Sequence, residues 1–384
     1  MKRLLVLSNG AGEDAIAARI LQRLPQELQD SVACCPLVGP GKALEGRYEL
    51  VGPRVLPPSE GLFRESWRLA LRDLATGVIA GHWRQLAFLK QQREHTGLTV
   101  AVGDLFPVLL AGLAGLKPLL FVGTAKSVYH HPYSAPERYL LKRWTDHSIV
   151  RDGATAEKLT AQGLAARWLG NAMMDEVAPT GRPLPLPADG PLITLLPGSR
   201  QEAPRVLPFQ LQTLLALRTR HPDLRAAVAA APGADPEELS QGCREEGWSL
   251  HSCPGEGALG LLEKDGWSVP LLQGRLGDLL AHSTVVLGQA GTANEQAAGA
   301  GVPVVAYDAR GVRNLRWYRK RQVGLLGDAV KVVLPESQAI EAELDHLLRD
   351  PAERQRRGAI GRERMGEAGG SERMARAIAG LWRP

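Results

Sequence analysis

Short apolar runs alternate with helical segments along most of the chain. In the first half, runs rich in leucine and valine occur at residues 4–7, 32–38, 98–102, 119–122 and 148–150. A helical pattern at residues 15–24 separates the first two runs. Regular alternation of strands and helices favours parallel sheets that are covered on both faces. The first half therefore predicts an α/β domain.

The alternation stops near the middle of the chain and then restarts. Residues 178–191, APTGRPLPLPADGP, contain five prolines and no periodicity, which is typical of a linker. Strand patterns return at residues 192–196, 226–230, 269–272, 285–287, 304–306 and 330–333, before a helical tail at 340–381. The sequence thus predicts a first domain at residues 1–177, a linker at 178–191, a second domain at 192–365 and a closing helical segment at 366–384. We expect a cleft between the two domains.

The composition is that of a globular protein, with 384 residues, 44% hydrophobic and 23% charged. The net charge of +5 favours an anionic partner, which a nucleotide or a lipid surface would satisfy. Aromatic residues make up 5%, and no DNA- or RNA-binding motif is present, so we expect no nucleic acid partner. The four cysteines lack the spacing of a zinc site or a disulfide framework.

The sequence favours a cytoplasmic location. The apolar run at residues 4–7 is too short for a signal peptide, and no window approaches the length of a membrane-spanning helix. We therefore expect any membrane contact to be peripheral, on the inner face of the membrane.

The segment at residues 284–308 predicts a strand, a glycine turn, a helix and a second strand. Gly288 and Gly291 allow a tight turn, and Thr292 and Asn294 are candidate caps for the helix that follows. The free N–H groups of that helix end favour an anion or a set of hydroxyl groups. An ordinary turn between strand and helix is the alternative.

A second turn of the same kind lies upstream. The strand at residues 192–196 continues into Pro197-Gly198-Ser199-Arg200. The planar guanidinium of arginine suits a diphosphate, and open α/β sheets bind ligands beyond the carboxyl ends of their strands. Together the two turns predict a binding site.

The first turn of the chain, SNGAGEDA, formally matches the dinucleotide fingerprint through Gly10, Gly12 and Ala15. We reject that interpretation, because the second strand ends without an acidic residue for the ribose and Glu13 would occupy the place of the pyrophosphate. Glu13 or Asp14 could instead hold an acceptor hydroxyl or act as a base. Simple helix-end electrostatics is the alternative.

Asp104 follows the strand at residues 98–102 in a glycine turn among apolar neighbours. In such a place the pKa of a carboxylate can rise toward that of a general base, although a capping aspartate is the alternative. His130 and His131, after the strand at 119–122, could supply hydrogen bonds in the cleft or could be exposed loop residues.

Residues 61–90 could contact a membrane. Apolar side chains that share one helical stripe are Phe63, Trp67, Ala70, Leu71, Leu74 and Val78, and Trp83 and Phe88 continue the aromatic pattern. Basic residues that accompany them are Arg64, Arg68, Arg72, Arg84 and Lys90. This pattern is typical of an interfacial helix on anionic lipid, and a helix packed in the core is the alternative.

These segments resemble the lipid-A-disaccharide synthases, specifically the divergent related branch known from cyanobacteria. The resemblance is carried by LGNAMMD at residues 169–175, LLPGSRQE at 195–202, GQAGTANEQ at 288–296 and Gly301-Val302-Pro303. In colinear order these motifs cover nearly the whole chain, most densely from residue 169 to residue 308.

The resemblance implies the GT-B fold, with two Rossmann-like domains facing across a cleft and a C-terminal helix that crosses back to the first domain. It also implies an inverting glycosyltransferase that uses a UDP-sugar and requires no metal or other cofactor. The implied donor residues are Gly198, Ser199, Arg200, Gly291, Thr292, Asn294, Glu295 and Gln296. The implied catalytic residues are Asp104 as the base and Glu13 facing the acceptor, with Gly10, Gly12, His130 and His131 in the acceptor-side loops.

The sequence departs from the family at Gln296, where the ribose-binding glutamate is expected, and in the shorter Gly103-Asp104 turn. The leading hypothesis is a peripheral membrane enzyme that glycosylates a lipid-linked acceptor. A UDP-sugar 2-epimerase of the same fold and a non-catalytic nucleotide-sugar-binding protein are the alternatives.

Overall fold

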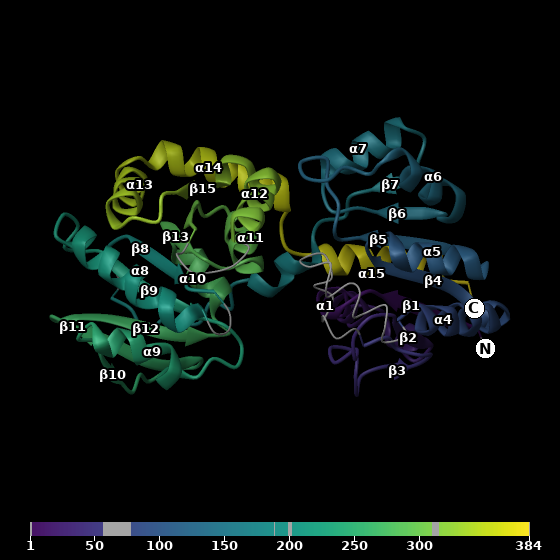
Figure 1. The fold of residues 1–384 in the computed structure, drawn as a ribbon, viewed down its shortest axis with the longest axis horizontal. Coiled ribbons are helices and arrows are strands. Elements are labelled where there is room, and N and C mark those ends of the chain that lie inside the picture. The colour runs from purple at the N-terminus through teal and green to yellow at the C-terminus, as the bar shows by residue number, and fades with distance from the viewer. Residues whose placement is uncertain (1, 57–77, 188, 199–201, 309–314, 384) are drawn as a thin grey trace. The chain divides into compact units, whose positions relative to one another are not determined.

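The computed structural model describes residues 2–56, 78–187, 189–198, 202–308 and 315–383. The chain divides by packing into two compact units. Unit 1 comprises Met1–Ala172 and Gly369–Pro384, and unit 2 comprises Met173–Ala368. Each unit is built around one β-sheet (Figure 1). No helix in the described part of the chain combines the length and the apolar content needed to cross a bilayer.

The sheet of unit 1 is parallel throughout, in the order β3-β2-β1-β4-β5-β6-β7. Its strands are β1 (Arg3–Ser8), β2 (Val32–Pro36), β3 (Glu49–Leu50), β4 (Thr96–Gly103), β5 (Leu119–Gly123), β6 (His147–Ile149) and β7 (Ala166–Arg167). All eight residues of β4 are buried, as a strand covered on both faces requires. The order of the first six strands is that of a Rossmann fold.

Helices cover both faces of this sheet. Helices α1 (Ala11–Leu21) and α15 (Gly370–Leu381) share a core with Leu4 and Val6 of β1. The opposite core, with Leu5 and Leu7, is covered by α4 (Val78–Gln92), α5 (Leu105–Ala114), α6 (Ala135–Trp144) and α7 (Gly153–Ala161). Alternate residues of β1 therefore serve the two cores, as the pleat of a strand dictates.

The C-terminal helix α15 is part of unit 1 by its packing. Met374, Ala375 and Ile378 of α15 are buried in the core formed with α1. Trp382, just after α15, reaches the start of β4, where a Cβ on Gly97 would lie 2.9 Å from its ring. The expected return of the C-terminal helix to the first domain is confirmed.

The sheet of unit 2 has the order β10-β11-β12-β9-β8-β13-β14-β15. Its strands are β8 (Leu192–Leu196), β9 (Arg225–Ala230), β10 (Ser249–His251), β11 (Ala258–Lys264), β12 (Trp267–Gln273), β13 (Val285–Gly288), β14 (Val304–Tyr307) and β15 (Val330–Val333). Its helices are α8 (Ala203–Arg218), α9 (Pro236–Glu245), α10 (Leu276–His282), α11 (Thr292–Gly299), α12 (Leu315–Leu326), α13 (Ser337–Arg349) and α14 (Pro351–Met365). The parallel part again has the Rossmann order, so the predicted fold class is confirmed.

One edge of this sheet corrects the expectation of purely parallel sheets. Strands β10, β11 and β12 pair antiparallel. A two-residue loop joins β11 to β12, with φ values of 50° at Asp265 and 69° at Gly266. Positive φ at both positions is the geometry of a tight hairpin turn, for which Asp-Gly is a preferred sequence. The Asp-Gly pair was the available signal for this hairpin.

The proline-rich segment is anchored to unit 2 at its start. Asp278 on α10 accepts hydrogen bonds from the N–H groups of Thr180 and Gly181, at 2.7 and 3.1 Å. Arg275, which pairs with Asp278, donates to the carbonyls of Arg182 and Pro183. Residues 180–183 are therefore fixed on α10. The expected domain boundaries at 177 and 191 stay predictions.

Candidate functional site

Strands β1, β4 and β5 of unit 1 are neighbours, and their carboxyl ends lie at one edge of the sheet. The order of the strands reverses between β1 and β4. Strand β1 is flanked by β2 on one side and by β4 on the other, and β5 follows β4. Open α/β sheets bind ligands in the crevice beyond the carboxyl ends of strands at such a switch point. The predicted residues Glu13 and Asp104 lie at this edge, just after β1 and β4.

Asp104 is the N-cap residue of α5 and is also bonded to the turn after β1. Its Oδ1 atom accepts hydrogen bonds from the N–H of Phe106 and from Nδ2 of Asn9, each at 2.9 Å. In the described part of the chain, Oδ2 of Asp104 accepts no hydrogen bond. The structure thus combines both interpretations of Asp104, since a capping role through one oxygen leaves the other available to a substrate.

Glu13 lies close to Asp104. A Cβ on Gly103 would lie 3.1 Å from Cγ of Glu13, and the φ of Gly103 is 133°, a backbone conformation that favours glycine. Thr124, after β5, has its Oγ1 3.5 Å from Oε1 of Glu13. Burial raises the pKa of Glu13, and the negative charges of Asp104 and Asp14 raise it further. A carboxyl group of this kind can exchange a proton closer to neutral pH than an exposed one.

Asp14 has a different role from Glu13. Its side chain is 1% exposed and accepts a 2.5 Å hydrogen bond from Oγ of Ser8, which is also buried. Burial raises the pKa of Asp14, and the Ser8 bond opposes that rise. Of the two carboxylates proposed for this turn, Glu13 is therefore the one at the edge of the sheet.

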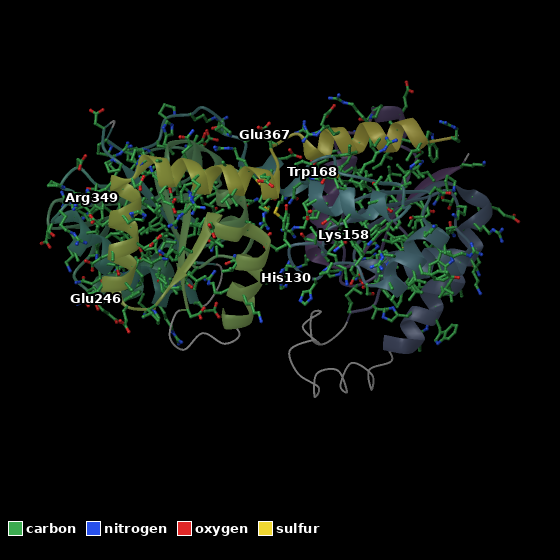
Figure 2. All side chains as sticks on the ribbon, turned by 90° about the horizontal axis from the view of Figure 1, so that it is seen from above. His130, Lys158, Trp168, Glu246, Arg349 and Glu367 are labelled. Carbon is green, nitrogen blue, oxygen red and sulfur yellow. The ribbon has the colours of Figure 1, made fainter. Side chains whose placement is uncertain are left out.

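The remaining acceptor-side residues lie in the neighbouring loops. Gly10 has a φ of 130° and a Cβ there would lie 3.1 Å from Oε2 of Glu13, whereas a Cβ on Gly12 would meet nothing. His130, labelled in Figure 2, exchanges backbone hydrogen bonds with Ser127 in the loop after β5. His131 has a φ of 54°, which is unusual for a residue with a side chain, and its ring stacks edge-on against that of His130. Both histidines follow Thr124 in the same loop.

In unit 2 the two predicted turns meet at the switch point of the second sheet. Strands β8 and β13 are parallel neighbours, and the N–H of Gln289 donates to the carbonyl of Leu196 at 2.7 Å. Gly198 has a φ of 103°, and a Cβ there would lie 3.8 Å from the carbonyl oxygen of Gln289. Ser199 and Arg200 lie outside the described residues.

The start of α11 corrects the expected caps. The N-cap residue is Gly291, and no side chain caps the helix. Asn294 is fully buried, and its Nδ2 donates to the carbonyl of Gly288 at 3.2 Å. Asn294 therefore holds the end of β13, and a Cβ on Gly288 would overlap its side chain. Within the part of the chain that the structure describes, no side chain caps the first N–H groups of α11.

The side chains farther along α11 are buried in unit 2. Glu295 and Gln296 are each 4% exposed. Nε2 of Gln296 donates to the carbonyl of Met173 at 2.9 Å and to Oε2 of Glu176 at 2.8 Å, both in the 3-10 helix Ala172–Val177. A role of Gln296 in ribose binding stays a prediction, and the described contacts of its amide lie within unit 2.

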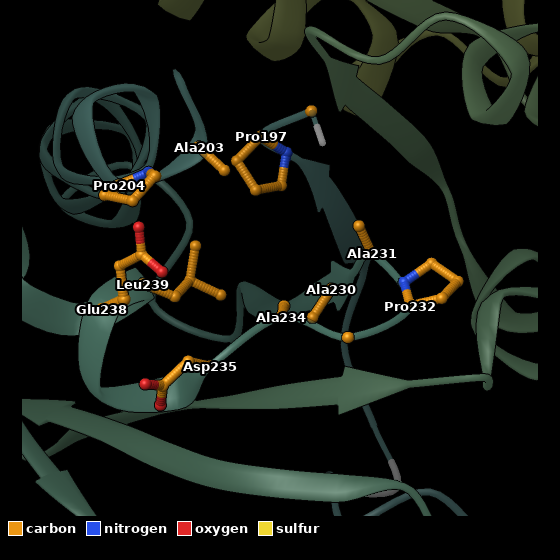
Figure 3. Close-up of a pocket in the computed structure, with 12 residues that line it drawn as sticks. Pro197, Ala203, Pro204, Ala230, Ala231, Pro232, Ala234, Asp235, Glu238 and Leu239 are labelled. Atoms are coloured by element: carbon orange, nitrogen blue, oxygen red, sulfur yellow. The ribbon is translucent and has the colours of Figure 1, made fainter. Parts of the chain in front are cut away.

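A cavity of about 480 Å³ adjoins the Gly198 turn (Figure 3). Its wall combines the turn after β8, the loop after β9 and the starts of α8 and α9. Small side chains such as Ala203, Ala231 and Ala234 line it, with the carboxylates of Asp235 and Glu238 at one side. Its volume falls within the range of small-molecule sites. No pattern in the sequence indicates this cavity, because its wall is assembled from segments that are distant along the chain.

The turn after β13 is supported by two residues that the sequence pattern did not indicate. Arg319 and Gln322 of α12 are 2% and 0% exposed and bond to that turn. The sequence around Arg319 and Gln322 contains no recognisable motif. Their contacts with the turn arise only because the folded chain brings α12 next to it. Among the described residues, no three His, Cys, Asp or Glu side chains are grouped to hold a metal ion. Independence from a metal stays a prediction.

No family model matches this sequence. The chain is 29% identical, over 410 residues, to the lipid-A-disaccharide synthase of Anaeromyxobacter sp. (strain K), covering 99% of this chain and 98% of that protein. It is 27% identical, over 235 residues, to the lipid-A-disaccharide synthase of Geobacter sulfurreducens, covering 56% of each. The resemblance seen in the motifs is confirmed, and the identities are those of a divergent relative.

Solved structures share the fold at low identity. The MurG protein of Acinetobacter baumannii superposes with a TM-score of 0.60 at 12% identity, covering 99% of this chain and all of that chain. The UDP-GlcNAc 2-epimerase of Neisseria meningitidis, bound to UDP-GlcNAc, superposes with a TM-score of 0.55 at 12% identity, covering 98% and 99%. The chain has the two-domain GT-B fold and is related in sequence to glycosyltransferases of the lipid-A-disaccharide synthase type.

Proposed function

We propose that this protein is an inverting glycosyltransferase that moves a sugar from a UDP-sugar to a lipid-linked acceptor. The observation that carries the proposal is the pairing of Glu13 and Asp104 at the switch point of unit 1, in a chain similar over its length to lipid-A-disaccharide synthases. In this proposal unit 1 handles the acceptor and unit 2 binds the donor.

Asp104 is the proposed general base. The hydroxyl oxygen of the acceptor forms a bond to the anomeric carbon while the bond from that carbon to the diphosphate oxygen breaks. The UDP leaves with the bonding electron pair, and the hydroxyl proton passes to Oδ2 of Asp104. Because Asn9 and Phe106 hold Oδ1, the carboxylate keeps one orientation during the transfer. A single displacement of this kind inverts the anomeric carbon.

Glu13 is proposed to bind the acceptor rather than to take its proton. Burial raises the pKa of Glu13, so its carboxyl group takes up a proton more readily than an exposed glutamate does, and a protonated carboxyl group can donate a hydrogen bond as well as accept one. Gly10, Gly12, His130 and His131 stay proposed neighbours of the acceptor.

The donor is proposed to bind at the two turns of unit 2. The diphosphate would interact with the Gly198-Ser199-Arg200 turn and with the N–H groups at the start of α11, which favour an anion. The cavity beside Gly198 adds room for another part of the nucleotide sugar. A nucleotide sugar in the Neisseria structure, which shares this fold, is consistent with that assignment.

A lipid-linked acceptor requires contact with a membrane, and α4 offers part of such a surface. Trp83 is 66% exposed, and Arg84 and Lys90 are exposed on the same helix. Phe88 instead packs against the core of unit 1. The stripe at Phe63, Trp67, Leu71 and Leu74 lies outside the described residues. We propose that Trp83 and its basic neighbours belong to a peripheral docking surface on the cytoplasmic face of the membrane.

The test is to incubate the full chain with a panel of UDP-sugars, with and without a bacterial lipid extract, and to follow UDP release and the sugar product. Release of UDP that depends on the extract and yields a glycosylated lipid would support the proposal. Conversion of the UDP-sugar to its 2-epimer without lipid would establish the epimerase instead. Binding of UDP without turnover of any sugar would identify a nucleotide-sugar-binding protein.

A further inference from the structure

The turn between β13 and α11 is bonded to buried side chains of α12. Nε2 of Gln322 donates to the carbonyl oxygens of Ala290 and Gly291, at 3.1 and 3.0 Å. Oε1 of Gln322 accepts a 2.6 Å hydrogen bond from Arg319. Gln322 is 0% exposed and Arg319 is 2% exposed. Since both ends of the amide are bonded, Gln322 can adopt only one orientation here.

Arg319 contacts the same turn a second time, through Gln289. Its guanidinium donates to Oε1 of Gln289 at 2.6 Å, and Nε2 of Gln289 donates to the carbonyl of Tyr307 at 2.7 Å. The backbone N–H of Gln289 is bonded to Leu196. The turn is thereby tied to α12, to β14 and to β8. Buried networks whose members are bonded on both sides hold a backbone in one conformation.

The bonds from Gln322 bear on the direction of two amide groups: the carbonyl of Ala290 is held by Gln322, and the carbonyl of Gly291 is held by Gln322 together with the N–H groups of Asn294 and Glu295 in α11. A trans peptide unit is planar, and its N–H points opposite to its C=O. Because the carbonyls of Ala290 and Gly291 face Gln322, the N–H groups of Gly291 and Thr292 point away from α12. These N–H groups stand at the start of α11, where a helix leaves its amides without internal partners. An anion at this turn binds to N–H groups oriented in this way.

We propose that Gln322, oriented by Arg319, is a positioning residue for the diphosphate of the donor. The inference rests on the proposed function, which assigns that diphosphate to this turn. Gln322 does not touch the ligand. It sets the direction of the Gly291 N–H group and, with the internal bonds of α11, that of the Thr292 N–H group, so donor affinity depends on a helix that follows the site by more than twenty residues in the chain.

The test uses two variants of Gln322 in the full chain, with calorimetry against UDP and against inorganic diphosphate. Gln322→Glu keeps an acceptor for Arg319 but has no N–H to donate to the carbonyls. Gln322→Met keeps the size of the side chain and removes all three hydrogen bonds. We expect each variant to lose at least about tenfold in affinity for UDP and for diphosphate, the loss that follows when a charged ligand loses one well-placed hydrogen bond.

Arg357→Met is the matched control, because Arg357 is also a buried arginine of unit 2 but bonds to Glu343 and Glu353 instead. It should lower the thermal midpoint and leave UDP affinity unchanged. Folded Gln322 variants with the affinity of the wild type would overturn the inference. An equal loss of affinity in Arg357→Met would also overturn it, since the effect would then follow stability alone. A wild-type chain that binds neither UDP nor diphosphate would instead contradict the proposed function.

Discussion

Nδ2 of Asn9 donates a 2.9 Å hydrogen bond to Oδ1 of Asp104, and this bond joins the turn after β1 to the turn after β4. The two residues are far apart in sequence and meet because β1 and β4 are neighbours in the sheet. Asn9 and the N–H of Phe106 occupy the same oxygen, so the other oxygen of Asp104 is the one that a substrate can use.

Asp104→Asn should abolish transfer with little change in fold. The oxygen of the amide can still accept from Phe106, so the cap of α5 is kept, but an amide cannot take up the proton of the acceptor. General-base catalysis contributes about 10²–10⁴ in rate, and we expect a loss of kcat of that size with unchanged UDP affinity. Steady-state kinetics and calorimetry measure the two quantities.

Asp350→Asn serves as the control for this variant, because Asp350 caps α14 through the N–H of Glu353 in the same manner. It should keep the turnover of the wild type. Retention of most turnover in Asp104→Asn would remove Asp104 from the mechanism and leave Glu13 as the next candidate base.

Glu13→Gln should stabilise the protein at neutral pH. The folded pKa of Glu13 is raised above 4.5 by burial first and then by the nearby carboxylates, so the folded state holds the proton more tightly than the unfolded state. Stability from this group is complete below pH 4.5 and is lost as the pH rises through the folded pKa. Glutamine is neutral at every pH, so the Glu13→Gln variant does not lose this stability as the pH rises.

Urea unfolding at pH 4.5 and at pH 7 measures the effect. The free energy of unfolding of Glu13→Gln relative to wild type should be higher at pH 7 than at pH 4.5. An equal difference at both pH values would show that burial does not perturb Glu13. If Glu13 binds the acceptor, Glu13→Gln should gain stability and lose affinity for the acceptor, as is common for substitutions at functional sites.

Arg357→Met should destabilise unit 2 strongly. Arg357 is buried and pairs with Glu353 and with the buried Glu343, each at 2.7 Å. Removing one partner of a buried ion pair costs about 3–5 kcal/mol. The cost for Arg357→Met should be near the lower value, because Glu343 keeps Lys331 as a partner. The neighbouring Arg356→Met removes two partly exposed pairs, with Asp328 and with Glu353, and should destabilise the protein much less than Arg357→Met. Equal losses in urea unfolding would contradict this account of the network.

Trp83→Ser combined with Arg84→Glu should weaken binding to anionic vesicles. A basic residue near such a surface contributes roughly 1 kcal/mol, and reversal of its charge together with loss of the indole should reduce binding at least about tenfold. Co-sedimentation with vesicles of anionic phospholipid measures the change. Leu334→Ser, which removes an exposed apolar side chain of unit 2, should bind as the wild type does. Undiminished binding by the folded double variant would exclude α4 from the docking surface.

The strands that the sequence predicted well are the ones buried on both faces. The predicted range 192–196 coincides with β8, and the predicted range 285–287 lacks only the last residue of β13, because a largely apolar run that is buried throughout leaves little doubt about where such a strand lies. The sequence missed β10 and β11 for the opposite reason. They form the edge of the sheet, where most of their side chains are exposed or half-buried and the apolar pattern is weak.

The candidate site shows a similar limit. Glu13 and Asp104 could be predicted because each follows an apolar strand in a glycine turn. Asn9, Thr124 and Gln322 could not, since their roles depend on which strands are neighbours and on where α12 returns to the sheet. Strand order is a property of the whole fold and leaves no mark in the sequence around a single residue.

The packing of α15 on α1 sets an order of events during synthesis. A ribosome makes the strands of unit 1 first, then all of unit 2, and only afterwards the helix Gly370–Leu381. Until that helix emerges, the core around Leu4, Val6 and Ile20 lacks Met374 and Ile378 and presents apolar surface to the cytosol. Unit 2 is continuous in sequence and can finish folding first. The nascent chain therefore carries an incomplete unit 1 for the whole time that unit 2 is being translated.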